Sequence, residues 1–172
     1  MQHDAFIKKL SAYGVNGSVF EWLKCYLKNR ICYVKSEGFI SRPYYPSSGV
    51  LQGSMLSLLL FVLFINDITS VIQNSECLLY ADDMKLYKVV REDRDGDHLQ
   101  EDLNKICEWC DQWSLKVNGD KCNAISFSRK QTPQVRQYEI KGKPLIRVNE
   151  INDLGVTVTN LNGLSFDKFT KQ

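Results

Sequence analysis

The chain has 172 residues, of which 44% are hydrophobic, and its 22 Lys and Arg residues nearly balance 20 Asp and Glu residues. This length is typical of one domain, and the hydrophobic content is sufficient for a buried core, which excludes a disordered chain. The net charge of +2 gives no bulk attraction for a polyanion, so any contact with nucleic acid depends on local basic residues.

The sequence predicts neither secretion nor a membrane span. The N-terminus lacks a basic and apolar leader, and the longest apolar stretch, residues 55–65, is shorter than the roughly 20 residues that a spanning helix needs. Six cysteines include one C-x-x-C pair, Cys107 and Cys110, without a second pair or a His pair nearby. Buried, reduced thiols in an intracellular protein are therefore expected, and the compartment within the cell stays open.

Hydrophobic spacing predicts a helix over residues 4–13, which ends at Gly14. A second helix follows, with Ser18 as the expected N-cap and Glu21 three residues later in a capping box.

Residues 31–35 and 39–45 flank Ser36-Glu37-Gly38, a pattern that predicts a β-hairpin. The apolar segment 55–67 follows, and we expect a buried helix packed under a sheet.

Two adjacent carboxylates then stand between two short apolar runs. Cys77-Leu78-Leu79-Tyr80 precedes them and residues 84–90 follow, so a hairpin with Asp82 and Asp83 at its tip is predicted. Like charges this close repel unless a cation neutralises them. Mg²⁺ accepts one or two protein carboxylates together with substrate phosphates. The alternative is a solvated turn, because Asp is a favoured turn residue.

The remaining elements complete a single α+β domain. Residues 91–97 are expected to form a charged loop, and the spacing of Leu99, Leu103, Ile106, Cys110 and Trp113 predicts an amphipathic helix whose apolar face enters the core. Later expectations are a strand at 124–127, a hairpin about Lys141-Gly142 and a strand at 154–158.

The order of these segments resembles the reverse transcriptase domain of non-LTR (LINE-type) retrotransposons. The segment Ser48-Gly49-Val50-Leu51-Gln52-Gly53-Ser54 is similar to the family's Gly-Val-Pro-Gln-Gly-Ser element, and Tyr80-Ala81-Asp82-Asp83 is similar to its Tyr-x-Asp-Asp box. Further blocks that match in order are Trp22 to Arg30, the group Trp109, Trp113, Leu115, Asn118 and Lys121, and Asp153-Leu154-Gly155-Val156, which resembles the primer-grip hairpin.

The resemblance implies roles for particular residues in Mg²⁺-dependent nucleotidyl transfer. Asp82 and Asp83 would be catalytic metal ligands, and Lys121 would hold or protonate the leaving pyrophosphate. Gln52, Gly53, Ser54 and Tyr80 would lie near the RNA template, the DNA primer and the incoming dNTP. Each has a simpler interpretation: a helix start for Gly53-Ser54, a structural aromatic for Tyr80 and a solvated side chain for Lys121.

The family's fold implies a partial polymerase palm, an antiparallel sheet packed on helices, with a palm-like core over about residues 1–130 and a primer-grip-like hairpin and tail over about 131–172. Another metal-binding aspartate and the fingers are expected before residue 1, so the two-metal site would be incomplete and the chain inactive alone. Leu51, Ser57 and Leu58 also depart from the family pattern. Asp4 does not replace the aspartate, because its position suits a helix cap.

Two other functions stay open at this point. Scattered basic residues, Arg30, Lys35 and Arg42, could contact phosphate in a noncatalytic nucleic-acid or protein interaction module, or they could be ordinary solvated surface. The chain could also be a decayed element copy without function. The sequence leaves the oligomeric state and the template preference open.

Overall fold

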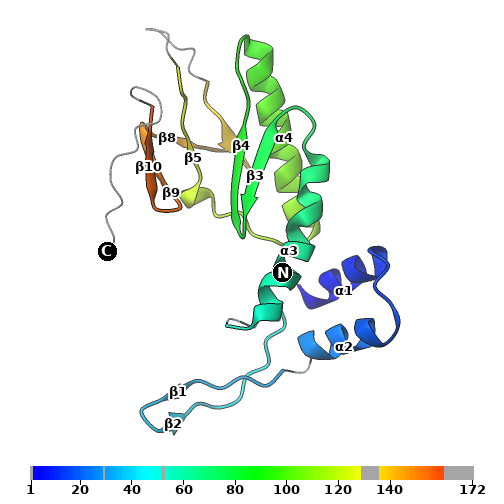
Figure 1. Cartoon of the computed structure of the whole chain (residues 1–172). Helices are drawn as coiled ribbons and strands as arrows, with labels where there is room; N and C mark the ends of the chain where they lie inside the picture. The colour runs from blue at the N-terminus through cyan, green and yellow to red at the C-terminus, as the bar shows by residue number, and fades with distance from the viewer. Residues whose placement is uncertain (1, 29, 52, 129–135, 161–172) are drawn as a thin grey trace.

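The computed structural model describes residues 2–28, 30–51, 53–128 and 136–160, and within them it mixes helices with small sheets (Figure 1). This confirms the α+β class. The α-helices are α1 (His3–Ala12), α2 (Gly17–Leu27), α3 (Met55–Ile65) and α4 (Asp93–Gln112). Two 3₁₀ helices are η1 (Asn66–Val71), which continues α3, and η2 (Gly119–Lys121).

The described strands pair two by two instead of forming the one antiparallel sheet that the sequence suggested. Four pairs are antiparallel hairpins and β5–β8 is parallel, and most strands are only two residues long. The strands are β1 (Lys35–Ser36), β2 (Phe39–Ile40), β3 (Glu76–Tyr80), β4 (Asp83–Tyr87), β5 (Asn123–Ala124), β6 (Glu139–Ile140), β7 (Lys143–Pro144), β8 (Ile146–Arg147), β9 (Glu150–Asp153) and β10 (Val156–Thr159).

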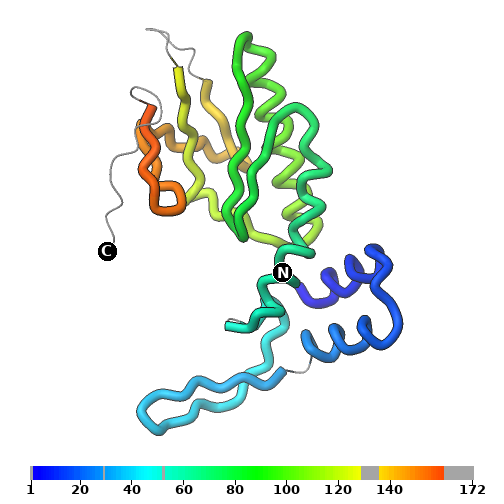
Figure 2. The backbone as a smooth tube through the Cα atoms, in the orientation of Figure 1, coloured from blue at the N-terminus to red at the C-terminus, as the bar shows by residue number. Residues whose placement is uncertain are grey.

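Figure 1 shows how these elements are arranged. The β3–β4 hairpin lies beside α4, and the β9–β10 hairpin lies on the other side of β5 and β8. Helices α1 and α2 pack together below α3. The β1–β2 hairpin projects away from the rest of the molecule, as the backbone tube in Figure 2 also shows.

The core lies where the four α-helices meet. Phe6 and Phe64 are completely buried, and their rings make an edge-to-face contact at 5.8 Å. Phe64 makes a second edge contact with Trp109 at 6.0 Å. Leu10, Leu23, Leu27, Leu60, Ile65, Ile68, Ile106 and Cys110 complete the buried cluster.

The buried ammonium group of Lys9 connects α1 to α3, η1 and the C-terminal end of α4. Lys9 on α1 is 3% exposed, donates a hydrogen bond of 2.7 Å to the Phe64 carbonyl at the end of α3, and pairs with Asp67 on η1. Its Nζ also lies 4.2 Å and 4.1 Å from the ring centroids of Trp109 and Trp113. Burial lowers the pKa of Lys9, while the hydrogen bond to Asp67 partly offsets that effect.

We expect Lys9→Met to lower the free energy of unfolding by about 1–3 kcal/mol, because it leaves Asp67 without its cation and removes the contacts with the aromatic rings. Urea unfolding measures the change. Lys8→Met is the matched control: Lys8 is exposed on the same helix, so its removal should change stability by less than about 0.5 kcal/mol. Equal stabilities for the two variants would contradict the structural role of Lys9.

Two expected helix caps are wrong. The N-cap of α2 is Asn16, Ser18 lies inside the helix, and Glu21 pairs with Lys24 at 3.4 Å instead of closing a capping box. Asp4 lies in the first turn of α1, after the N-cap Gln2, and its carboxylate pairs with Lys28 at 2.7 Å. In sequence, an acidic residue in the first turn is hard to tell from an N-cap residue, because both interact favourably with the positive N-terminal end of the helix dipole.

The predicted charged loop at 91–97 is also wrong, because α4 already begins at Asp93. The Asp95 carboxylate accepts hydrogen bonds from the backbone N–H groups of Arg91 and Glu92, at 2.8 Å and 3.2 Å, and these bonds lower its pKa. Backbone groups at the start of a helix need such partners. The first turn of α4 is therefore stabilised by acidic side chains, which hydrophobic spacing does not reveal.

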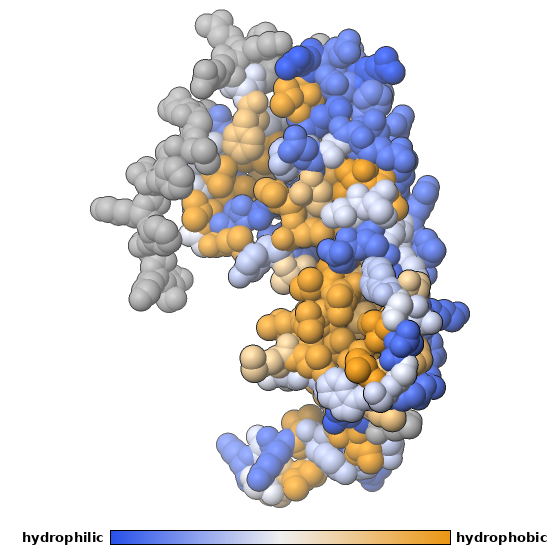
Figure 3. Space-filling view, turned by 45° about the vertical axis from the view of Figure 1, so that its right-hand side comes forward, coloured by the Kyte–Doolittle hydropathy of each residue, from blue (hydrophilic) through white to orange (hydrophobic). Residues whose placement is uncertain are grey.

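Helix α3 confirms the predicted helix, but only one side of it is buried. Ser57, Leu60, Phe64 and Ile65 are buried. Met55, Leu58, Leu59 and Val62 are exposed, by 92%, 70%, 55% and 49%. Figure 3 shows hydrophobic surface gathered in the middle of the molecule, where α3 lies. An all-apolar sequence gives no periodicity from which the buried side could be predicted.

None of the six cysteines is in a disulfide bond, which agrees with the expected reduced thiols. Cys107 and Cys110 are buried in α4, and burial raises the pKa of both, to about 11 for Cys110. None of the described helices is long and apolar enough to cross a membrane.

Two-residue turns close the four described hairpins. Three of them have Gly in the second turn position, as in Lys141-Gly142, with positive φ at both residues. The β3–β4 turn differs at its second position, where Asp82 stands in place of glycine, and its first residue, Ala81, has a φ of 52°. Left-handed backbone is unfavourable for alanine, so this turn stores strain that glycine would relieve.

We expect Ala81→Gly to raise the free energy of unfolding by roughly 0.5–1 kcal/mol, since the relief of strain exceeds the extra chain entropy of glycine. Ala5→Gly within α1 is the control and should lower it by roughly the same amount. Thermal and urea unfolding of both variants measure these changes. If Ala81→Gly is less stable than the unmodified chain, the turn is not strained.

Candidate functional site

The β3–β4 hairpin places two adjacent carboxylates at its tip, as the sequence predicts. The register pairs Tyr80 with Asp83, so Ala81 and Asp82 form the turn and Asp83 is the first residue of β4. Both carboxylate side chains are exposed. Among the described residues no ion pair or hydrogen bond joins the Asp82 side chain to another group, so its oxygens face solvent or a ligand.

Lys85, two residues after Asp83 on β4, is a site residue that the sequence reasoning missed. Its Nζ lies 3.6 Å from the Asp83 carboxylate and 2.7 Å from that of Asp153. The close contact with Asp153 and the nearby Asp83 charge raise the pKa of Lys85. Lys85 therefore joins the acidic hairpin to the β9–β10 hairpin, whose turn is Leu154-Gly155.

The strand alternation contains the signal for this contact. Residues two apart on a strand lie on the same face, so Lys85 is placed beside Asp83. Asp153 lies about 70 residues away in sequence, and no local pattern connects it to β4. The expected strand at 154–158 is accordingly corrected to a hairpin.

The donors at this tip fit a hard divalent cation. Carboxylate oxygens are the protein ligands that Mg²⁺ accepts, and one or two are sufficient when substrate phosphates complete the shell. No group of three His, Cys, Asp or Glu side chains that could hold a metal ion is found in the described parts of the chain. Asp82 and Asp83 therefore offer part of a site, with Lys85 as a competing cation.

Gly53 and Ser54 lie at the start of α3. Gly53 has a φ of 81°, and Ser54 is the N-cap residue. The Ser54 hydroxyl is 2.7 Å from the Tyr26 hydroxyl, which is also 3.3 Å from that of Ser57. The structure thus supports the helix-start interpretation and links it to α2. Gln52 lies outside the described residues.

Tyr26 is a second residue that sequence reasoning did not single out. Hydrogen bonds with Ser54 and Ser57, together with the nearby Arg30 charge, lower its pKa. The Arg30 guanidinium lies 4.7 Å from the Tyr26 ring centroid, and its Nε donates a 2.9 Å hydrogen bond to the Tyr26 carbonyl. Stacking and hydrogen bonding together fix the direction of Arg30.

Two other predicted residues are exposed and are not joined to the carboxylates. Tyr80 is 63% exposed at the end of β3. Lys121 is exposed in η2, next to Asp120, which pairs with Lys143. In the described ranges, no hydrogen bond or ion pair joins Lys121 to Asp82 or Asp83.

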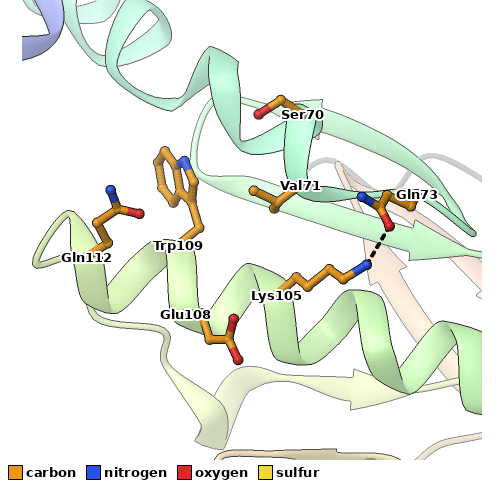
Figure 4. A pocket seen from close by; sticks show the side chains of 7 residues that line it. All are labelled: Ser70, Val71, Gln73, Lys105, Glu108, Trp109 and Gln112. Carbon is orange, nitrogen blue, oxygen red and sulfur yellow. Dashed lines mark hydrogen bonds between the residues drawn. The ribbon is translucent and has the colours of Figure 1, made fainter.

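A cavity of about 290 Å³ lies elsewhere, between η1 and α4 (Figure 4). Lys105 donates a 2.8 Å hydrogen bond to Gln73 across one end of it. Its lining contains none of the predicted site residues and consists of Ser70, Val71, Gln73, Lys105, Glu108, Trp109 and Gln112.

Comparison with known proteins identifies the family. Residues 1–158 match the family model described as reverse transcriptase (RNA-dependent DNA polymerase). The chain is 32% identical over 171 residues to the "probable RNA-directed DNA polymerase from transposon BS" and 30% identical over 142 residues to that from transposon X-element, both of Drosophila melanogaster. These alignments cover 91% and 80% of this chain.

The chain spans 18% and 16% of the length of those two relatives. A third relative, the "retrovirus-related Pol polyprotein from type-1 retrotransposable element R2" of Popillia japonica, is 24% identical over 93% of this chain and 29% of that protein. The family model and the relatives agree with the motifs around the acidic hairpin, and this chain therefore belongs to the reverse transcriptase family of non-LTR retrotransposons.

Proposed function

We propose that this chain supplies the catalytic hairpin of an RNA-directed DNA polymerase, which joins dNTPs to a DNA primer on an RNA template. One observation carries the proposal: Asp82 and Asp83 are exposed next to each other at the two-residue turn of the β3–β4 hairpin. Membership of the reverse transcriptase family supports it. The noncatalytic module is less favoured, because an interaction surface does not need adjacent, repelling carboxylates.

In this proposal Asp82 and Asp83 hold Mg²⁺. When bound, the metal stabilises negative charge on the attacking and leaving oxygens of phosphoryl transfer. Asp82 is the principal ligand because its side chain has no described partner, whereas Asp83 shares its charge with Lys85. Lys85 therefore reduces the net negative charge at the tip. When a metal cation binds, Lys85 either moves away from Asp83 or stays close to the metal despite the repulsion between the two positive charges.

The remaining residues would position the substrates. Gln52 and Gly53 are assigned to the junction of template and nucleotide, where glycine permits close backbone approach. Ser54 contributes through its hydrogen bond to Tyr26, which fixes the loop. Tyr80, exposed beside Asp83 in the hairpin register, is assigned to the nucleotide or primer, and Lys121 to the leaving pyrophosphate.

The same proposal assigns the domain organisation. Residues 1–130 form the palm-like core, and 131–172 include the β9–β10 hairpin as the primer grip. The Lys85–Asp153 ion pair supports this assignment, because it holds the β9–β10 hairpin next to the acidic tip. We assign the protein to the cell interior, because the proposed reaction uses an RNA template.

Metal binding tests the central assignment. Mn²⁺ accepts the same oxygen ligands as Mg²⁺ and broadens nearby NMR signals. We expect selective broadening of the amides around Asp82, and we expect Asp82→Asn to abolish it by removing an anionic ligand. Glu101→Gln removes an exposed charge from α4 and should leave the broadening unchanged. Equal broadening in Asp82→Asn would contradict the metal site.

Primer extension tests the reaction. With Mg²⁺, an RNA template and a DNA primer, we expect no extension by the chain alone, because the described residues contain no group of three His, Cys, Asp or Glu side chains that could hold a metal ion. Extension that Asp82→Asn abolishes would confirm the site and contradict the expected inactivity. Extension that survives this substitution would contradict the catalytic role.

Hydrogen exchange tests the primer-grip docking. Lys85→Met removes the cation that joins Asp83 to Asp153, so the amides of Glu150–Asp153 and Val156–Thr159 should exchange faster than in the unmodified chain. Lys88→Met, directly after β4, is the control, because Lys88 contacts Asn74 and Asp95 and neither Asp83 nor Asp153. Unchanged exchange in both variants would show that other contacts dock the hairpin.

A further inference from the structure

A projecting hairpin between α2 and α3 has no role in the proposed chemistry. We call residues 31–45 the arm; it contains β1 and β2 and extends away from the helices (Figures 1 and 2). All its residues are exposed except Cys32, which is half-buried. An isolated two-stranded hairpin is marginally stable in water, so the arm gains little from its own contacts, and its side chains are exposed.

The arm combines aromatic rings with positive charge. Tyr33, Phe39 and Tyr45 are exposed by 56%, 81% and 68%. The arm contains two basic residues, Lys35 and Arg42, and one acidic residue, Glu37. Neither basic side chain is in an ion pair with a described residue. At the bottom of Figure 3, where the arm lies, hydrophilic and hydrophobic surface are mixed. Proteins that bind single-stranded nucleic acid combine basic groups with rings on which bases stack.

The strand register brings one ring and two cations of the arm close together. Lys35 pairs with Ile40, and a hydrogen bond of 2.9 Å from the Ser41 N–H to the Val34 carbonyl extends the pairing. Because side chains alternate between the two faces of a strand, Tyr33 and Lys35 share a face, and Arg42 follows Ser41 on the neighbouring strand, next to Tyr33. A nucleic-acid strand that lies along the arm would therefore meet the ring of Tyr33 and the positive charges of Lys35 and Arg42.

The base of the arm meets the proposed nucleotide site. Arg30, held over Tyr26, directly precedes the arm, and Tyr26 in turn bonds to Ser54. After β2 the chain returns to Gly53 and α3 (Figure 1). One continuous segment therefore runs from the tip of the arm to the loop that the proposed function assigns to template and nucleotide.

We propose that the arm binds an unpaired stretch of the RNA template next to this loop, with Lys35 and Arg42 on phosphates and Tyr33 stacked on a base. The identity of the strand as template rests on the proposed function; the binding of a single strand does not. A second copy of the arm is a poorer partner, because its positive charges would face the same charges.

Fluorescence anisotropy with a labelled 16-nucleotide poly-uridine RNA tests the arm. The Lys35→Gln/Arg42→Gln variant should weaken binding several-fold at low salt and reduce the slope of log Kd against log salt by about 1.4, which is about 0.7 for each lost phosphate contact. Arg94→Gln/Lys116→Gln removes two exposed charges elsewhere and should retain the slope. Equal slopes in the two double variants would overturn the proposal.

The stacking contact has its own test. Tyr33→Leu should weaken RNA binding about tenfold, since loss of one stacked base is of this size. Tyr13→Leu, at an exposed tyrosine after α1, should leave it unchanged. A poly-uridine·poly-adenine duplex should bind more weakly than the single strand, because its bases are already stacked; tighter binding of the duplex would overturn the stacking claim.

Three further outcomes separate this proposal from the catalytic one. Loss of Mn²⁺ broadening at Asp82 with arm-dependent RNA binding intact would overturn only the catalytic assignment. Mn²⁺ binding at Asp82 with RNA affinity unaffected by the arm variants would overturn only the arm. A dimer in light scattering that Phe39→Ser dissociates, without RNA binding at 50 mM salt, would show that the arm joins two copies instead.

Discussion

The ammonium group of Lys9 is the interaction on which the arrangement of the helices depends. It bonds to the last turn of α3 and to η1, and it lies against the aromatic rings of α4. A desolvated charge tolerates few geometries, because each lost partner leaves an uncompensated penalty. The helices that carry these partners are consequently held at one mutual position, whereas an apolar contact would allow them to slide.

The position of the β3–β4 hairpin depends on the contacts of Lys9, because η1, which pairs with Lys9 through Asp67, leads directly into β3. The completely buried carboxylate of Asp102 on α4 accepts backbone hydrogen bonds from Gln73 and Asn74, at 3.1 Å and 2.8 Å, where η1 leads into β3. Burial alone would raise the pKa of Asp102, but these hydrogen bonds hold it below its ordinary value. The carboxylate therefore stays charged and fixes the entry to β3. The tip at Asp82 is thus supported from both α3 and α4.

Local chemistry made much of this predictable. Asp82 and Asp83 stand between two strand-forming runs, so the hairpin follows from the sequence, as does the helix at 55–65. The start of α4 was missed because its stabilising groups are the polar Asp93 and Asp95. Contacts across long sequence separations were missed as well. Lys9 with Asp67, Lys85 with Asp153 and Tyr26 with Ser54 depend on how the helices and hairpins meet, which no single segment encodes.

The distribution of the thiols has a practical consequence. Burial raises the pKa of Cys77, Cys107, Cys110 and Cys122, which suppresses their nucleophilic thiolate form. Cys25, by contrast, is exposed on α2, next to Tyr26. A maleimide dye should therefore attach first at Cys25, without any cysteine being removed. Such a dye would sit on α2, the helix that leads into the arm, and report changes in the surroundings of that helix.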